Sequence, residues 1–440
     1  MISKIADSMT KIVVRYLPHP LIFAILLTFI MLIISIFLQH SVIKVIHIWG
    51  DGFFNLLTFS MQMSLIIVSG YALASSSLVS NLLKKTASLV KTPRMAAFFV
   101  TLFGLIACSI NWGFGLIVGA IFAKEMARQV KGCDYGLLIA CAYIGFLSWG
   151  AGFSGSMPLL AATPGNPVES ISNGIIPLSQ TIFTSYNAFV LIGLIVVMPI
   201  ATYYMLPKNP IPIDPKLLQE KVPYQEISKN LTNPTPAQKL ESSRILSLFV
   251  VLIGIIYLGV YIYENGFNFT INTINLIFII LGFVLHKTPM AYMNAVTKAT
   301  ASCAGIIIQF PFYASIALLM EKSGFGEIIT QFFIQIANKD SFALTTFISS
   351  AIINFAVPSG GGHWVIQGPF IIGAAKEIGA DLGKATMAIA YGEQFANMIQ
   401  PFWAIPALAI AGLGVRDIMG FCVTAMIISA PIFLVALILF

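Results

Sequence analysis

The sequence predicts an all-α polytopic membrane protein made of two inverted-topology repeats, each with a re-entrant hairpin and a broken transmembrane helix. Of its 440 residues, 58% are hydrophobic and only 9% are charged, against roughly 25% charged in an ordinary soluble domain. A mean hydropathy of +0.90 means that lipid must solvate most of the exterior. Interruptions of the apolar runs recur at an offset of about 243 residues, which indicates an internal duplication.

Several apolar runs are close to the ~20 residues that a helix needs to cross a bilayer. They cover residues 21–38, 53–77, 188–206, 245–263, 271–285, 302–320 and 418–440. Lys4, Lys11 and Arg15 precede the first run, and no small-residue cleavage site follows it. We therefore expect an uncleaved first span with the N-terminus in the cytoplasm.

One long polar segment, at residues 207–244, divides the chain. It mixes basic and acidic residues with several prolines, and its Lys and Arg content is typical of a cytoplasmic loop. The expected organisation is an N-terminal membrane half at 1–206, a cytoplasmic linker at 207–244 and a C-terminal membrane half at 245–440.

Each half contains an apolar region interrupted by a polar, glycine-containing segment. The first region covers about residues 95–123 and is interrupted by SINWGFG at 109–115; the second covers about 343–375 and is interrupted by NFAVPSGGGHW at 354–364. Non-helical backbone at membrane depth is tolerated only where protein or a water-filled cavity surrounds it. The two regions therefore predict re-entrant hairpins whose tips mark a binding site.

The charges beside the two hairpins predict opposite orientations in the membrane. Lys91, Arg94 and Lys131 flank the first hairpin, so we expect its base in the cytoplasm. The flanks of the second hairpin, which begin with Lys339 and Asp340, are neutral in sum and suit the outer face. The halves are therefore expected to be inverted relative to each other, as in many secondary transporters.

An apolar helix with a polar, Gly- or Pro-containing centre follows each hairpin, at about residues 135–166 and 385–412. The second break contains Glu393, the most deeply placed acidic residue of the sequence. An intramembrane carboxylate is a functional candidate by default, so we expect Glu393 to carry a coupling proton or to help bind a cation. A structural ion pair with a residue such as Lys376 is the alternative.

The second hairpin tip offers a cradle for a carboxylate. Three consecutive glycines let the backbone approach a ligand closely, and a half-helix that begins there presents unpaired N–H groups and a partial positive charge. Close helix packing is the alternative explanation for these glycines. His363 beside them could carry a proton, donate to the substrate or be a fixed hydrogen-bonded side chain.

These arguments select two sets of site residues. The candidate substrate-binding residues are Ser109, Asn111, Trp112, Gly113, Ser154, Ser156, Asn354, Ser359, Gly360, Gly361, Gly362, His363, Trp364 and Asn397. The candidates for the coupling ion, H⁺ or Na⁺, are Glu393, Asn111, Ser359 and Gln400. For the two asparagines, capping of a broken helix is the alternative role. Trp112, Trp149, Trp364 and Trp403 are expected to form an aromatic wall against a short aliphatic tail.

Several classes of function are disfavoured. No HExxH, GxSxG or P-loop pattern is present, so we expect neither an enzyme nor a nucleotide-driven pump. The five cysteines and five histidines are scattered, which predicts no metal site and no cofactor. Positive-inside topology accounts for the net charge of +7 without a nucleic-acid partner. A passive channel is the main rival, although the polarity is concentrated in the breaks rather than along a pore.

The strings NFAVPSGGGHWVIQGPF at 354–370 and SINWGFGLIVGAIFAKE at 109–125 resemble the bacterial short-chain fatty acid transporter family. The similarity covers nearly the whole chain, and the combination of the Ser-Gly-Gly-Gly string with Gln367-Gly368-Pro369 is quite specific. At position 363, where this chain has His, Gln is common in the family. This departure bears on substrate preference and on any proton role.

The resemblance implies membership of the ion transporter superfamily, with inverted repeats, paired hairpins, a homodimer and elevator-like motion. It implies uptake of short-chain carboxylates such as butyrate or acetoacetate across the bacterial inner membrane, in contact with lipid. Another small organic anion, such as a dicarboxylate or an amino-acid conjugate, is the alternative substrate. The tips carry no cationic residue, which disfavours highly charged substrates.

Overall fold

The computed structural model describes residues 2–16, 19–218, 235–266, 270–400 and 402–440, and these residues contain helices but no strand. Six helices in the described ranges are long and apolar enough to cross a membrane. They are α2 (Pro20–Gln39), α6 (Pro93–Ile110), α11 (Ser185–Tyr203), α14 (Arg244–Asn265), α17 (Ala304–Ser323) and α23 (Val415–Leu439). The predicted all-α polytopic fold is confirmed.

Two further predicted spans also form helices. The helix α4 (Leu57–Ser75) bends by 73° into α5 (Ser77–Ser88), and α15 (Ile271–His286) is a shorter apolar helix. Ser76 adopts an extended backbone between α4 and α5, and its side chain caps α5. The remaining connecting elements are α1 (Ile2–Tyr16), α3 (Val42–Gly52), α10 (Glu169–Ser172), η2 (Leu178–Gln180), α12 (Pro215–Leu218), α13 (Pro236–Glu241), α16 (Pro289–Thr300), η3 (Ala301–Cys303) and α18 (Phe325–Gln335).

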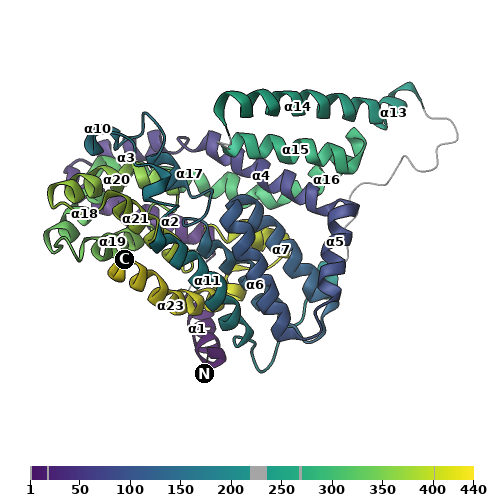
Figure 1. Cartoon of the computed structure of the whole chain (residues 1–440), viewed down its shortest axis with the longest axis horizontal. Coiled ribbons are helices and arrows are strands. Elements are labelled where there is room, and N and C mark those ends of the chain that lie inside the picture. The colour runs from purple at the N-terminus through teal and green to yellow at the C-terminus, as the bar shows by residue number, and fades with distance from the viewer. Residues whose placement is uncertain (1, 17–18, 219–234, 267–269, 401) are drawn as a thin grey trace.

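The internal duplication is visible in the order and the packing of the helices. The series α2, α3, α4, α5 is matched after the linker by α15, α16, α17, α18. The helices α2 and α3 pack against α17, and reciprocally α15 and α16 pack against α4 (Figure 1). Each half therefore supplies helices that cover the other half, and neither is a separate packing unit.

A hairpin follows in each half. The helices α6 and α7 (Trp112–Gln129) meet at Asn111, and α19 (Phe342–Ile353) is joined to α20 (Gly360–Glu377) by the non-helical residues 354–359. The broken helices come next. The helix α8 (Tyr135–Ile144) tightens into η1 (Gly145–Ser148) before α9 (Ser156–Ala161), and α21 (Leu382–Ala396) stops before α22 (Ile405–Ala411). Pro401, within the second break, lies outside the described residues.

The two hairpins enter the molecule from opposite ends of α11, which establishes their inverted relation. At the base of α6, the Arg94 guanidinium lies 5.7 Å from the ring centroid of Tyr203, at the end of α11. Just after the second hairpin, Gly383 at the start of α21 packs closely against the Gln180 carbonyl, which also accepts a 2.7 Å hydrogen bond from Tyr186, at the start of α11. Because α11 has 19 residues, about 28 Å of helix separates the two bases.

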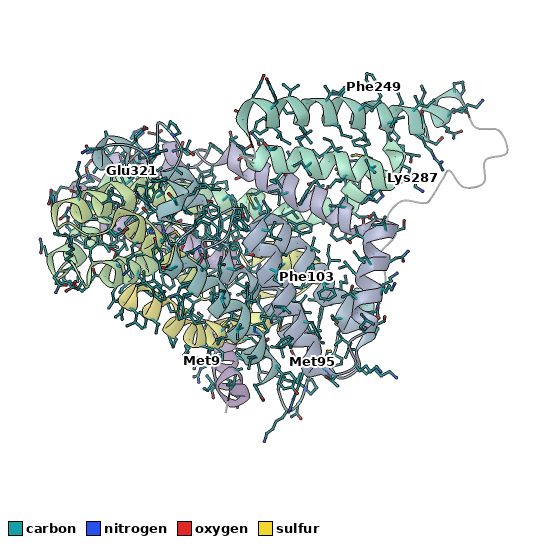
Figure 2. The ribbon with its side chains drawn as sticks, viewed as in Figure 1. Met9, Met95, Phe103, Phe249, Lys287 and Glu321 are labelled. Carbon is teal, nitrogen blue, oxygen red and sulfur yellow. The ribbon has the colours of Figure 1, made fainter. Side chains whose placement is uncertain are left out.

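The linker begins at the base of the first hairpin. The Ile211 N–H donates to Asp134 Oδ2 at 2.8 Å, and the Tyr135 N–H donates to the Ile211 carbonyl at 2.8 Å. Residues 219–234 of the predicted linker lie outside the described residues. Figure 2 places Met9 of α1 and Met95 of α6 at the same end of the molecule. The N-terminus, the start of the linker and the first hairpin base, all predicted to be cytoplasmic, thus lie toward the same end of the molecule.

Candidate functional site

Both hairpin tips and both helix breaks converge on one place. The Trp112 and Trp403 rings lie 5.1 Å apart, between the first tip and the second break. The Trp403 indole N–H donates to the Pro358 carbonyl of the second tip at 2.6 Å. The Trp112 backbone N–H donates to Ser154 Oγ of the first break at 2.9 Å. Four segments that the sequence singled out independently therefore form a single site.

The first tip is held by hydrogen bonds within itself and to the first break. Asn111 has an extended backbone and its Oδ1 accepts the Phe114 N–H at 2.9 Å, so it is the N-cap of α7. The Ser109 carbonyl accepts the Phe153 N–H at 2.7 Å. A Cβ at Gly113 would lie 3.0 Å from Ile66 Cδ1, so this glycine is explained by close packing.

The second tip leaves its N–H groups open. Ser359 is the N-cap of α20, but its Oγ lies 3.5 Å from the Gly362 nitrogen, a long contact. The N–H groups of Gly360 and Gly361 donate to no group among the described residues. The first N–H groups of a helix carry a partial positive charge and bind anions such as carboxylates.

The three glycines of this tip differ in what surrounds them. A Cβ at Gly360 would lie 2.7 Å from Trp149 Cη2 and 3.0 Å from Ser156 Cβ, so close packing explains this residue. At Gly361 the nearest atom, Leu160 Cδ1, would be 3.6 Å away, and at Gly362 the nearest would be at 3.5 Å. Close packing therefore does not require glycine at position 361 or 362.

The second break forms a buried polar layer behind this tip. The side chains of Asn354, Glu393, Gln394 and Asn397 are all 0% exposed. Asn354 Nδ2 donates to Asn397 Oδ1 at 2.9 Å and to the Glu393 carbonyl at 3.3 Å. Across the layer, the Tyr143 hydroxyl of α8 donates to the Asn397 carbonyl at 2.7 Å.

Many atoms of this layer have no hydrogen-bond partner within the described part of the chain. They are both carboxyl oxygens of Glu393, Asn354 Oδ1, Asn397 Nδ2 and both side-chain polar atoms of Gln394. Burying a polar group without a partner costs about 1–3 kcal/mol, so such groups in one place indicate a site for a polar ligand, an ion or ordered water. A proton or a hard cation suits the four oxygens, and the amide N–H groups of Gln394 and Asn397 can donate to an anion.

The structure excludes the ion pair considered for Glu393. Lys376 is exposed, and its Nζ donates to the Ile171 carbonyl at 2.7 Å instead. Gln400, a candidate for the coupling ion, already has partners on both polar atoms. Its Oε1 accepts the Phe402 N–H at 2.8 Å and its Nε2 donates to the Tyr313 hydroxyl at 3.3 Å.

Three of the four selected tryptophans gather as the aromatic wall requires. Trp112, Trp149 and Trp403 surround Phe146, which stacks on Trp149 at a centroid distance of 5.3 Å. Trp364 is also fully buried, but it belongs to a second apolar cluster with Met157 and side chains farther along α20. It therefore supports α20 from behind and is not part of the ring cluster.

His363 lies in the first turn of α20 and is held by residues that the sequence reasoning missed. Its Nε2 is 2.8 Å from Gln367 Oε1 and 3.3 Å from Ser350 Oγ, and all three residues are buried. The spacing of four residues between His363 and Gln367 could have revealed their pairing, because it places both side chains on one helix face. Serines within an apolar helix gave no such signal.

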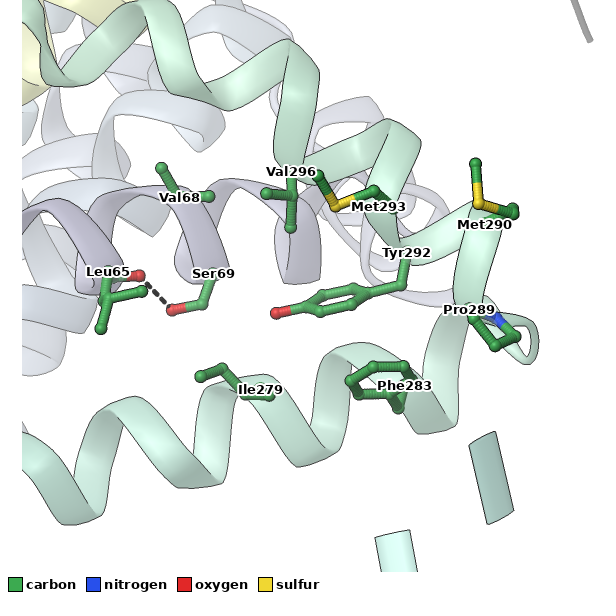
Figure 3. A pocket seen from close by; sticks show the side chains of 10 residues that line it. All are labelled: Leu65, Val68, Ser69, Ile279, Phe283, Pro289, Met290, Tyr292, Met293 and Val296. Carbon is green, nitrogen blue, oxygen red and sulfur yellow. Dashed lines mark hydrogen bonds between the residues drawn. The ribbon is translucent and has the colours of Figure 1, made fainter. Parts of the chain in front are cut away.

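A cavity of about 390 Å³ lies away from this site, between α4, α15 and α16 (Figure 3). Its wall is apolar apart from the Ser69 and Tyr292 hydroxyls, and Ser69 already donates to the Leu65 carbonyl at 2.5 Å. No residue of the two candidate sets lines it. The place where the tips and breaks meet is therefore better suited to a polar ligand than this apolar cavity. No group of three or more metal-ligating side chains occurs in the described ranges.

Comparison with known proteins gives consistent matches over the full length. A family model described as Short chain fatty acid transporter matches residues 1–440. A relative from Escherichia coli (strain K12) is 61% identical over 444 residues, covering 100% of both chains. Another, from Haemophilus influenzae (strain ATCC 51907 / DSM 11121 / KW20 / Rd), is 59% identical over 447 residues, covering 99% of both. The names of both assign them, provisionally, to short-chain fatty acid transport.

Among solved structures, the YdaH transporter of Alcanivorax borkumensis, described as having an unusual topology, matches 95% of this chain and 98% of its own. The sequence identity is 13% and the TM-score is 0.46, so the likeness is distant.

Proposed function

The chain belongs to the short-chain fatty acid transporter family, and we propose that it is a secondary active transporter that imports short-chain carboxylates such as butyrate or acetoacetate. One observation supports the site most directly. The open N–H groups of Gly360 and Gly361 lie at the start of α20, beside a buried layer of polar atoms without partners. A carboxylate accepts from such N–H groups, and the Trp112, Trp149 and Trp403 cluster offers an apolar surface for a short aliphatic tail.

Coupling to H⁺ or Na⁺ is part of the proposal, with Glu393 as the main candidate. Both of its carboxyl oxygens are buried without a partner in the described structure, and no described cation pairs with it. A buried carboxylate in this state is stabilised by binding a proton or a cation. Asn111 and Ser359 serve their helix caps, and Gln400 is engaged with Tyr313, so these three are weaker candidates.

The transport cycle that we propose is elevator-like. The hairpins and broken helices would move as one body against α2–α5 and α14–α18, in a homodimer of the bacterial inner membrane. The N-terminus and the central linker would lie in the cytoplasm. Single cysteines at Arg94 and Lys131, and at Lys339 and Lys384, provide the test of orientation. We expect membrane-impermeant reagents to label the first pair from the cytoplasm and the second from outside. Labelling of all four from one side would contradict the orientation.

The rival substrates and the rival mechanism make different predictions. A dicarboxylate normally recruits Arg or Lys, and no such side chain contacts either tip in the described structure. A passive anion channel needs a continuous polar pore, whereas the polar atoms here are enclosed between α19, α20 and α21.

Counterflow in proteoliposomes tests the proposed function. Vesicles loaded with unlabelled butyrate or acetoacetate receive the labelled acid outside, with and without sodium. Because protonated short-chain acids cross lipid unaided, protein-free liposomes of the same lipid are run in parallel. We expect saturable, protein-dependent counterflow with both acids. The absence of any saturable carboxylate flux would overturn the assignment, and dependence of that flux on sodium would select Na⁺ as the coupling ion.

A further inference from the structure

A chain of hydrogen bonds fixes the protonation of His363. The Thr346 carbonyl can only accept, so the Ser349 hydroxyl, 2.9 Å away, must donate to it. The Ser349 oxygen then accepts from the Gln367 side chain at 2.8 Å, which places the amide NH₂ of Gln367 on that side. The carbonyl oxygen of Gln367 consequently faces His363 Nε2 at 2.8 Å.

The second neighbour of His363 Nε2 leads to the same result. The Ser350 hydroxyl donates to the Ile389 carbonyl at 2.7 Å, so its oxygen faces His363 Nε2, 3.3 Å away, as an acceptor. With two acceptors around it, Nε2 carries the hydrogen. In a neutral imidazole the other nitrogen, Nδ1, is then an acceptor. His363 Nδ1 is buried and has no hydrogen-bond partner in the described ranges.

The open lone pair belongs to the helix turn at which the proposed carboxylate site begins. His363 is in the first turn of α20, and helical side chains lean toward the N-terminus of their helix. It therefore leans toward the end at which the N–H groups of Gly360 and Gly361 are free. A carboxylate has only acceptor atoms and cannot bind a second acceptor. The tautomer thus prevents a carboxylate from contacting Nδ1 unless a proton lies between them.

We propose that His363 Nδ1 takes up the proton that travels with the substrate, so that the site binds a carboxylate and H⁺ together. An N–H bond forms at Nδ1 at the expense of an O–H bond of hydronium. The resulting imidazolium donates to the carboxylate, and on the other side of the membrane the proton returns to water. The proposal about His363 rests on the proposed function and makes it more specific. It names H⁺ as the coupling ion and His363, ahead of Glu393, as the residue that carries it.

Other titratable groups around α20 are few. On α21, Glu393 lies in the same polar layer, whereas the Tyr391 hydroxyl donates to Asn187 Oδ1 at 2.8 Å. On α18, Glu327 lines a cavity against Val365 and Ile366, other side chains of α20. The helices α9 and α19 carry no titratable side chain, and Glu169 of α10 accepts from the Gly165 N–H. Glu393 is therefore the group from which His363 must be distinguished.

Proton uptake on binding, measured in detergent, makes that distinction without interference from passive permeation. The purified full-length protein in weakly buffered solution with a pH indicator receives butyrate at pH 7.5. We expect about one proton taken up per butyrate bound, and an apparent affinity that falls about tenfold for each pH unit above neutrality. His363→Gln and His363→Asn should bind butyrate with no proton uptake and no pH dependence. The Gln amide can take the place of Nε2 and still donate to Gln367, whereas the Asn amide takes the place of Nδ1.

Two further variants complete the comparison. Glu393→Gln should retain the proton uptake, and His286→Gln is the matched control, because His286 is on α15 with its Nε2 2.7 Å from the Ala72 carbonyl. Butyrate binding by the wild type without proton uptake would overturn the inference. So would proton uptake by both His363 variants. If the wild type binds neither butyrate nor acetoacetate, the proposed function itself fails, which is a different result.

Discussion

The two hairpin tips occupy equivalent places in the duplicated fold, yet their chemistry differs. At the first tip, Asn111 caps α7 at 2.9 Å and Ser154 accepts the Trp112 N–H at 2.9 Å. At the second tip, the Ser359 cap contact is 3.5 Å long and two glycine N–H groups have no acceptor in the described structure. Most of the N–H groups at the first tip therefore have acceptors, whereas those of Gly360 and Gly361 at the second tip are available to a ligand.

The buried polar atoms follow the same division. Unpartnered atoms of Asn354, His363, Glu393 and Asn397 all belong to the second half, whereas the first-half members of the site contribute only Trp149 Nε1 among the described residues. The two halves therefore share the order of hairpin and broken helix, but they differ in the number of unpartnered polar atoms that they bring to the site.

The largest expected effect comes from removing the single buried carboxylate of the site. Glu393→Gln keeps the shape of the side chain, so the fold should survive, but a neutral amide takes up no proton and has no negative charge to balance a cation. If Glu393, rather than His363, carries the coupling ion, accumulation of acetoacetate driven by an ion gradient should fall to the level of protein-free liposomes. Glu125→Gln is the matched control in the first half, where Glu125 pairs with Arg128 at 3.1 Å. Normal accumulation by Glu393→Gln would remove this carboxylate from the coupling mechanism.

A second test separates packing from ligand binding within the open tip. Gly361→Ala places its methyl group in ordinary contact, 3.6 Å from Leu160, whereas Gly360→Ala approaches Trp149 to 2.7 Å. We expect Gly361→Ala to retain thermal stability and to weaken butyrate binding about tenfold, the equivalent of ~1.4 kcal/mol. Gly360→Ala should lower the unfolding temperature. Unchanged butyrate affinity in a stable Gly361→Ala protein would mean that the ligand does not approach this backbone.

Much of this arrangement could be predicted from the sequence, because lipid imposes strong constraints. Apolar runs must be helical, and interruptions must be enclosed, so the spans, hairpins and breaks follow from composition and spacing alone. The convergence of the tips followed from the duplication. The sequence could not show which of the two tips has available N–H groups. Asn111 and Ser359 are both good N-cap residues, and they differ only in the geometry of their caps.

The hydrogen-bond chain around His363 shows a second limit. Ser349 and Ser350 lie in an apolar helix, where serine commonly bonds to its own backbone and carries no functional signal. Here Ser349 donates to the Thr346 carbonyl of its own helix, and because its hydroxyl hydrogen is used there, its oxygen accepts from Gln367 and orients that side chain.

The position of Trp364 shows a similar limit. It follows the second tip in sequence as Trp112 follows the first, but it packs into a different apolar cluster.

The smallest effect expected concerns the caps themselves and sharpens the comparison of the two tips. Asn111→Ala removes a 2.9 Å cap bond, and loss of an N-cap typically costs about 1 kcal/mol. Ser359→Ala removes only a 3.5 Å contact, so its cost in stability should be a few tenths of that. Unfolding midpoints in detergent at one scan rate compare the two variants. Butyrate affinity should show the opposite order, with the larger loss in Ser359→Ala because its hydroxyl lies at the open tip. Equal stability losses with equal affinity losses would mean that the tips are equivalent in chemistry as well as in place.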